Sequence, residues 1–186
     1  LSADMIIGIT GTLGAGKGTI VSFLQKHGVL HFSVRELITE HIKKRGLPVN
    51  RDSMVAVANT LRHERGPSYL VDELFNRAKA TKKPAVIESL RCPGEVESLR
   101  GKGEFLLLAV DADPKKRYER VVARQSSTDA VSYDEFIEQE EREMQSTDPF
   151  EQNIRWCMDH ADIVLINNSS FDELESKVDD IVKENL

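Results

Sequence analysis

The chain has 186 residues, of which 40% are hydrophobic and 30% charged, and its formal net charge is −6. This length and composition predict one soluble globular domain over residues 1–186 and exclude a fibrous or largely disordered chain. The acidic balance argues against general adhesion to nucleic acid or anionic lipid, so we expect a small-molecule partner and a monomer or small homo-oligomer.

No segment indicates export or membrane insertion. The first apolar run, Met5 to Ile9, is too short for a signal-peptide core or a membrane span. The cysteines, Cys92 and Cys157, lack the spacing of a zinc site, and the five histidines show no ligand spacing. We therefore expect free thiols, no membrane contact, a cytoplasmic location and no assigned role for any histidine.

Apolar runs recur along the chain with helical patterns between them. They are continuously apolar, as strands buried on both faces should be. This alternation predicts βαβ units in an α/β fold, a three-layer α/β/α sandwich with a five-stranded parallel sheet. The predicted strands are Met5–Thr10, Val29–Ser33, Ala85–Ser89, Phe105–Asp111 and Ile163–Asn167.

Helical stripes of apolar residues recur within 54–61, 70–78 and 171–182. Asp113-Pro114 and Asp148-Pro149 have the form of an N-cap followed by proline in the first helical turn. The helices over about 34–81 form an insertion suited to binding a second substrate. A polar stretch over about 125–134, before an acidic helix, predicts a short lid.

Residues 11–19 form a phosphate-binding signature between the first strand and a helix. Because glycine lacks a Cβ atom, successive backbone N–H groups can point at phosphate oxygens, and the helix adds its positive N-terminal end. Lys17 would reach the outer phosphates, and the Thr19 hydroxyl would lie near bound magnesium. The residues assigned to a donor triphosphate are Gly11, Thr12, Gly14, Ala15, Gly16, Lys17, Gly18 and Thr19.

Charged residues follow the third predicted strand, at the edge where parallel sheets bind ligands. Glu88 is a candidate for holding the water shell of the metal, and Arg91 for gripping an acceptor phosphate with two hydrogen bonds. The alternatives are that Glu88 caps the helix after Pro93 and that Arg91 forms a surface ion pair.

Arg117, Arg120 and Arg124 fall on one side of the helix expected after Asp113. Arginine stabilises the charge that phosphoryl transfer spreads over the equatorial oxygens. We assign Arg120 to the donor and Arg124, with Lys17 and Arg91, to catalysis. Arg142 is a candidate for completing the cationic ring around the phosphate; its alternative is a solvated position on an Arg/Glu-rich helix.

Taken together, these motifs resemble the adenylate kinase group of P-loop nucleoside monophosphate kinases, especially small related proteins of archaea and bacteria. Gly18 stands where the simplest form of the loop has Ser or Thr, and the run Gly-Lys-Gly-Thr resembles that of the group. Glu88 and Arg91 resemble the acid-x-x-Arg element of this group, and Arg120 and Arg124 resemble its lid-entry arginines. The acceptor side is matched by Ser33, Arg35 and Arg62.

The resemblance implies ATP and Mg²⁺ as cofactors and transfer of the γ-phosphate to a nucleoside monophosphate or similar nucleotide. A dephospho-CoA kinase is the alternative, since it shares the loop and an Ala-Asp strand entry followed by an Asn pair, here Asn167-Asn168. The acidic element expected of it after the second strand is missing. A non-catalytic ATP-binding regulatory module is the second alternative.

Overall fold

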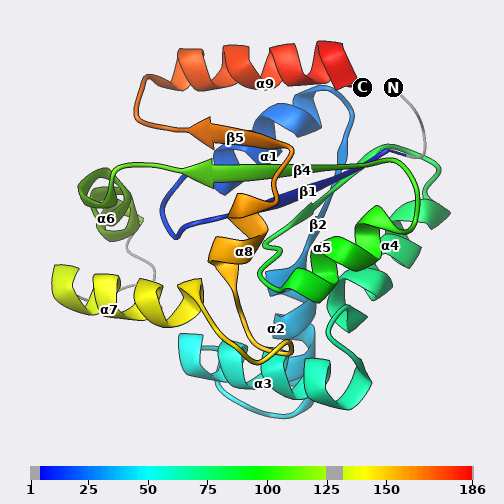
Figure 1. The fold of residues 1–186 in the computed structure, drawn as a ribbon, viewed down its shortest axis with the longest axis vertical. Coiled ribbons are helices and arrows are strands. Elements are labelled where there is room, and N and C mark those ends of the chain that lie inside the picture. Colours follow the sequence, from blue (N-terminus) through cyan, green and yellow to red (C-terminus); the bar gives the residue numbers. More distant parts are fainter. Residues whose placement is uncertain (1–4, 125–131, 186) are drawn as a thin grey trace.

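The computed structural model describes residues 5–124 and 132–185. Its strands form one parallel sheet in the order β2-β3-β1-β4-β5 (Figure 1). Each lies within a residue or two of its predicted position, which confirms the five-stranded parallel sheet. The strands are β1 (Ile6–Gly11), β2 (Leu30–Ser33), β3 (Ala85–Glu88), β4 (Phe105–Asp111) and β5 (Ile163–Ile166).

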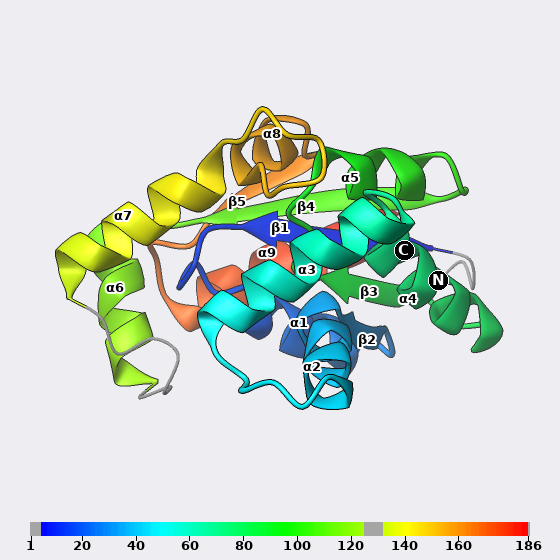
Figure 2. The same cartoon turned by 90° about the horizontal axis from the view of Figure 1, so that it is seen from below.

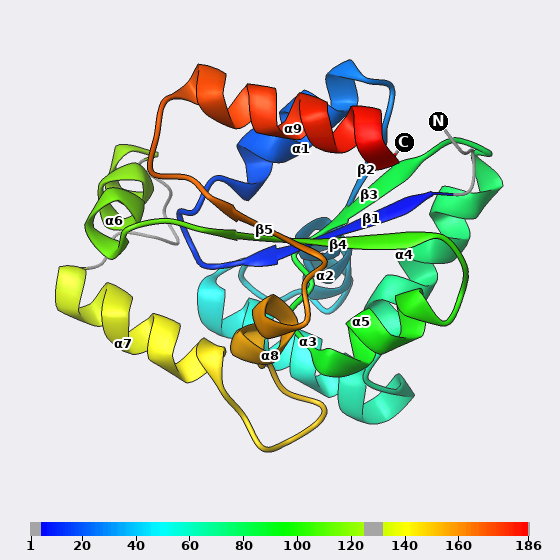
Figure 3. The ribbon, with the colours of Figure 1, turned by 45° about the horizontal axis from the view of Figure 1, so that its top comes forward.

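Helices cover both faces of the sheet, as the three-layer prediction requires. In Figure 3, α1 and α9 lie on one face, and α4, α5 and α8 lie on the other. The described helices are α1 (Lys17–Lys26), α2 (Val34–Lys44), α3 (Arg51–Arg65), α4 (Tyr69–Ala80), α5 (Pro93–Arg100), α6 (Pro114–Ala123), α7 (Tyr133–Met144), α8 (Ile154–Asp159) and α9 (Phe171–Asn185).

Two apolar cores explain why the strands read as continuous hydrophobic runs. Ile7 and Ile9 of β1 pack into the core under α1 and α9, whereas Ile6 packs into the core on the opposite face. Successive side chains of a strand point to opposite faces, so a strand covered on both sides needs apolar residues at every position.

The sheet order creates a crevice at the carboxyl end of β1. The helix that follows β1 covers one face of the sheet, and α5, which follows the neighbouring strand β3, covers the other. The two connections therefore separate at this edge, the usual ligand position in open α/β sheets. The segments that meet there are the loop after Gly11 and the turn after Glu88.

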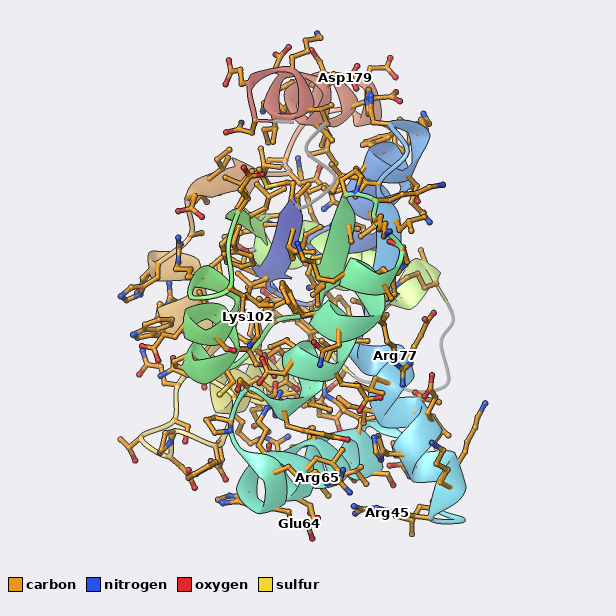
Figure 4. The ribbon with its side chains drawn as sticks, turned by 90° about the vertical axis from the view of Figure 1, so that its right-hand side faces the viewer. Arg45, Glu64, Arg65, Arg77, Lys102 and Asp179 are labelled. Atoms are coloured by element: carbon orange, nitrogen blue, oxygen red, sulfur yellow. The ribbon has the colours of Figure 1, made fainter. Side chains whose placement is uncertain are left out.

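The helices α2, α3 and α4 occupy the predicted insertion between β2 and β3. Figure 2 shows α3 between α2 and α7 at the bottom of the molecule. Ion pairs join the insertion helices on their outer surface: Arg45 to Glu64 at 4.0 Å and Arg77 to Glu40 at 3.4 Å (Figure 4). Such exposed pairs contribute little individually, so the insertion depends mainly on its apolar contacts.

One predicted helix start is confirmed and another is wrong. Asp113 caps α6, with Pro114 in the first helical turn. Asp148 instead accepts a hydrogen bond from the Phe150 backbone, closing a turn, and the next helix begins at Ile154 with Asn153 as its cap. An aspartate side chain serves a turn as well as a helix, so the Asp-Pro pair alone does not separate them.

The predicted lid falls largely on residues 125–131, which lie outside the described residues. The described chain resumes at Ser132, which caps α7 together with Glu135. Within the described ranges, no helix has the length and apolar character that a membrane crossing requires.

Candidate functional site

The loop between β1 and α1 needs glycine for steric reasons. Gly14 and Gly16 have φ angles of 78° and 105°, in the left-handed region. A Cβ atom on Gly14 would lie 2.4 Å from the Arg117 carbonyl oxygen, and one on Gly16 would lie 2.4 Å from the Asn167 side-chain nitrogen. A larger residue at either position would displace the loop.

The same loop presents backbone donors without protein partners. The N–H groups of Gly16, Lys17 and Gly18 donate to no acceptor among the described residues, as expected at the N-terminus of a helix. Gly18 faces open space, since a Cβ atom there would meet nothing within 4 Å. These donors and the positive end of α1 form a site suited to a phosphate group.

Other segments brace the loop from behind. The Thr12 hydroxyl donates to Asp111 at 2.7 Å, and the Asn167 amide donates to the Ala15 carbonyl oxygen at 2.8 Å. Arg120 donates to the Asn167 carbonyl oxygen at 2.9 Å and reaches the Gly14 carbonyl oxygen at 3.4 Å. Residues at the ends of β4 and β5 and on α6 therefore hold the loop in place.

Lys17 lies within the loop, where its Nζ donates to the carbonyl oxygens of Gly11 and Thr12, both at 2.8 Å. Burial, reinforced by the charges of Arg91 and Arg124 and only partly offset by Glu88 and Glu143, lowers the pKa of Lys17 to about 7. The loop by itself therefore disfavours the charged form of Lys17. Negative phosphate oxygens nearby would favour the charged form again.

Glu88 lies at the end of β3 and faces the same loop. Its Oε2 accepts a hydrogen bond from His31 Nε2 at 3.0 Å, and its Oε1 accepts none from the described residues. Burial alone would raise the pKa of Glu88, but the His31 hydrogen bond and the charges of Lys17, His31 and Arg91 hold it below its usual value.

Glu88, a carboxylate, and Thr19, a hydroxyl, both line a cavity beside the phosphate loop. They are oxygen ligands of the kind Mg²⁺ takes alongside phosphate oxygens and water. These two oxygen ligands therefore fit a magnesium ion that is held mainly by a bound triphosphate. The described residues contain no cluster of three or more side chains that would hold a metal by themselves.

A cavity of about 670 Å³ opens between the phosphate loop and the insertion helices. One wall is apolar and comes from α2 and α3: Val34, Ile38, Met54, Val55 and Ala58. The charged lining is mainly cationic and contains Lys17, Arg35, Arg51, Arg62, Arg91, Arg120 and Arg124, with Glu88 and Glu143 as the acids. This combination suits a ligand with an apolar body and anionic groups.

Four polar side chains meet in the lining of the cavity. Arg91 Nη1 donates to Glu143 Oε2 at 2.7 Å and to Gln152 Oε1 at 2.9 Å. Arg51 donates to Glu143 Oε1 through Nε at 3.1 Å and through Nη2 at 2.5 Å. One carboxylate, from the last turn of α7, thus joins two arginines from different segments.

The structure gathers most of the predicted site residues around this cavity. Of the loop, the cavity lining includes Gly14, Gly16, Lys17, Gly18 and Thr19, whereas Gly11, Thr12 and Ala15 lie behind it. Arg35, Arg91, Arg120 and Arg124 also line it. The roles given to these residues stay predictions.

Three of the predicted acceptor residues have other contacts. Ser33 caps α2 by accepting from the Glu36 backbone and is not part of the cavity lining. Arg62 borders the cavity, but its guanidinium pairs with the buried carboxylate of Glu95 at 2.8 Å. Arg142 is exposed and lines a second hollow, with Glu138 and Glu141, instead of this cavity.

The position expected of Arg142 is taken by its neighbour. Consecutive residues of a helix point about 100° apart, so Arg142 and Glu143 face different directions. It is Glu143 that lines the cavity. Arg117, which sequence analysis grouped with Arg120 and Arg124, is buried and forms an ion pair with Glu140 of α7.

The site residues predicted from the sequence do not include Arg51, Glu143, Gln152 and His31. Glu143 lies in a run of acids with no spacing that singles it out, and Gln152 belongs to an irregular segment. One feature of the sequence could have indicated His31: it lies two residues before the end of β2, the strand that pairs with β3. Its partner Glu88 becomes visible only when those strands are in register.

Comparison with known proteins agrees with the loop geometry. A family model described as an AAA domain matches residues 7–148. A UPF0200 protein of Pyrococcus horikoshii is 30% identical over 188 residues, covering 98% of this chain and 98% of that protein.

Solved structures show the same fold. TT1252 from Thermus thermophilus has a TM-score of 0.66 at 21% identity, covering 98% of each chain. A gluconokinase from Sinorhizobium meliloti has a TM-score of 0.61 at 12% identity, covering 100% of this chain and 95% of that one. The fold is thus that of P-loop kinases, and the chain belongs to the AAA-domain P-loop family and to the UPF0200 proteins.

Proposed function

We propose that the protein is an ATP-dependent phosphotransferase that moves the γ-phosphate of Mg-ATP to a nucleoside monophosphate or a similar nucleotide. The observation that carries this proposal is that the phosphate loop, Arg51, Arg91 and an apolar wall all line the same cavity. A kinase needs both a donor and an acceptor subsite within reach of each other.

On the donor side, the N–H groups of Gly16, Lys17 and Gly18 would bind phosphate oxygens, and Lys17 would become charged against them. Thr19 and the Oε1 atom of Glu88 would hold the magnesium ion and its water. When bound, the ion neutralises phosphate charge and orients the phosphates.

On the acceptor side, Arg91 and Arg35 would bind an anionic group, and the apolar wall of α2 and α3 would take a flat base. Arg124 borders the cavity at the end of α6 and would face the transferring group. Arg120 lines the same cavity and stays with the donor, because it contacts the carbonyl oxygen of Gly14 in the phosphate loop. The acceptor's own anionic oxygen is the nucleophile, so these residues need only position it and offset charge.

The test is a panel of acceptors incubated with ATP and Mg²⁺, with product identified by mass spectrometry. The panel should hold the nucleoside monophosphates, dephospho-CoA and gluconate, the last because a solved kinase with this fold is a gluconokinase. We expect turnover with a nucleotide. The variant Lys17→Met should lose about 10²- to 10³-fold in rate, while Lys26→Met, on the exposed end of the same helix, should not.

Retained turnover in Lys17→Met would contradict the proposed donor site. Phosphorylation of dephospho-CoA alone would favour the first alternative. The pair Asn167-Asn168 does not decide between a nucleoside monophosphate kinase and a dephospho-CoA kinase, because both side chains have structural contacts. Asn167 donates to the phosphate loop, and Asn168 accepts from the Asp113 backbone. Tight ATP binding without product from any acceptor would favour a non-catalytic ATP-binding module.

A further inference from the structure

Glu143 is an unusual carboxylate in a cavity built for anions. It belongs to the last turn of α7, where the helix dipole disfavours a negative charge. Its side chain is only 12% exposed. Nothing in the helix itself explains its position, which depends on the two arginines that it contacts.

The contacts of Glu143 have the form of a bound ligand. Its Oε1 takes two hydrogen bonds from Arg51 and its Oε2 takes one from Arg91. Guanidinium groups bind phosphate and carboxylate with the same donors, so an anion that enters between these two arginines competes directly with Glu143.

The three residues come from segments that are far apart in the chain. Arg51 begins α3, Arg91 follows β3, and Glu143 is near the end of α7. Figures 1 and 3 show the end of α7 beside the start of α3, below the carboxyl edge of the sheet. Glu143 thus connects the first turn of α3 to the turn that carries Arg91.

Resting on the proposed function, we propose that Glu143 occupies the place of the acceptor's phosphate between Arg51 and Arg91, and that this competition sets how strongly an acceptor's anionic group must bind these two arginines in order to enter the site. An acceptor must displace a monoanionic carboxylate that is already covalently attached to the chain. A dianionic phosphate gains more from the two arginines than a monoanionic group does, because it offers more charge and more acceptor oxygens. Glu143 therefore sets the threshold that an acceptor's anion must exceed, and Arg51 is a contact of that anion.

The test uses inorganic phosphate as a probe, with the donor loop first filled by a non-hydrolysable ATP analogue and Mg²⁺. Phosphate is titrated at pH 8, and its affinity is read from the Nε–H resonances of Arg51 and Arg91 in NMR spectra; acetate is the monoanionic comparison. In Glu143→Gln, which keeps the shape and removes the charge, phosphate should bind about tenfold more tightly. Acetate should gain by a similar factor, because either anion has to displace the same carboxylate.

The matched control is Glu141→Gln, the same charge change on an exposed residue of the same helix, which should behave as the unchanged protein. Glu143→Ala provides a second variant if the amide makes its own hydrogen bonds to the arginines. Unchanged or weaker phosphate binding in both folded Glu143 variants would overturn the proposal, because it would mean that the carboxylate only braces α7. The readout needs no turnover, so it is independent of whether the acceptor panel yields a product.

Discussion

At the scale of single residues, Lys17 links the shape of the loop to its chemistry. Its ammonium group is enclosed by the loop that it helps to close, and the carbonyl oxygens of Gly11 and Thr12 are its neutral acceptors. Burial disfavours its charge most, two nearby arginines add to this cost, and together they lower its pKa to about 7. A polyanionic ligand reverses this balance because it supplies the missing negative charge.

This predicts that binding of a triphosphate takes up a proton. At pH 8 the ligand-free Lys17 is mostly neutral, and in the complex it is charged, so binding of Mg-ATP should take up about one proton. At pH 6 the group is already protonated, and the uptake should be near zero. Calorimetric titrations in two buffers of different ionisation enthalpy measure it. Lys17→Arg, charged at both pH values, should show no uptake, and buffer-independent heats for the unchanged protein at pH 8 would contradict the assignment.

At the scale of elements, a buried ion pair connects α3 to α5. The side chains of Arg62 and Glu95 are 1% and 0% exposed. Glu95 Oε1 takes two hydrogen bonds from Arg62, and its Oε2 takes the backbone N–H groups of Arg91 and Cys92. The pair therefore sets the position of the insertion helix and of the turn that carries Arg91.

Removing one partner of this pair should be costly. Arg62→Leu leaves the Glu95 carboxylate buried without its counter-charge, which should lower the free energy of unfolding by about 3–5 kcal/mol. Chemical denaturation measures this. Arg65→Leu, one turn later on an exposed part of α3, should cost less than about 1 kcal/mol. If the two variants were equally stable, Glu95 would have to be neutral or hydrated in the folded protein.

At the scale of the whole molecule, the conformation of the phosphate loop depends on residues at the ends of three strands. The loop leaves β1, but its conformation is held from the ends of β4 and β5, through Asp111 and Asn167. The protein carries a net charge of −6 and still gathers seven cations around one cavity. The field at the site is thus set by tertiary placement and not by the net charge of the chain.

This predicts that a residue outside the loop controls donor binding. Asn167→Ala leaves the Ala15 carbonyl oxygen without its donor and loosens the loop, so Mg-ATP should bind about tenfold more weakly. Isothermal titration calorimetry is the measurement. The adjacent Asn168→Ala, which affects only the exposed Asp113 backbone, should bind ATP normally. Equal affinities for the two variants would mean that the loop holds its shape without the brace from β5.

Most of the fold could be predicted from the sequence because its signals are local. The strands of a sheet covered on both faces must be apolar throughout, and the loop glycines are required by the left-handed backbone at Gly14 and Gly16. The start of the helix at Asn153 was missed because Asp148 could equally cap a helix or close a turn.

The sequence by itself determined the class of fold, the positions of its strands along the chain and the phosphate loop, since each depends on residues close together in the chain. Only the tertiary structure decided which other side chains line the cavity. It brought Arg51, Arg91 and Glu143 together, turned Arg142 outward and committed Arg62 to Glu95. Such contacts join segments separated by 30 residues or more and depend on how helices pack, which no local pattern encodes.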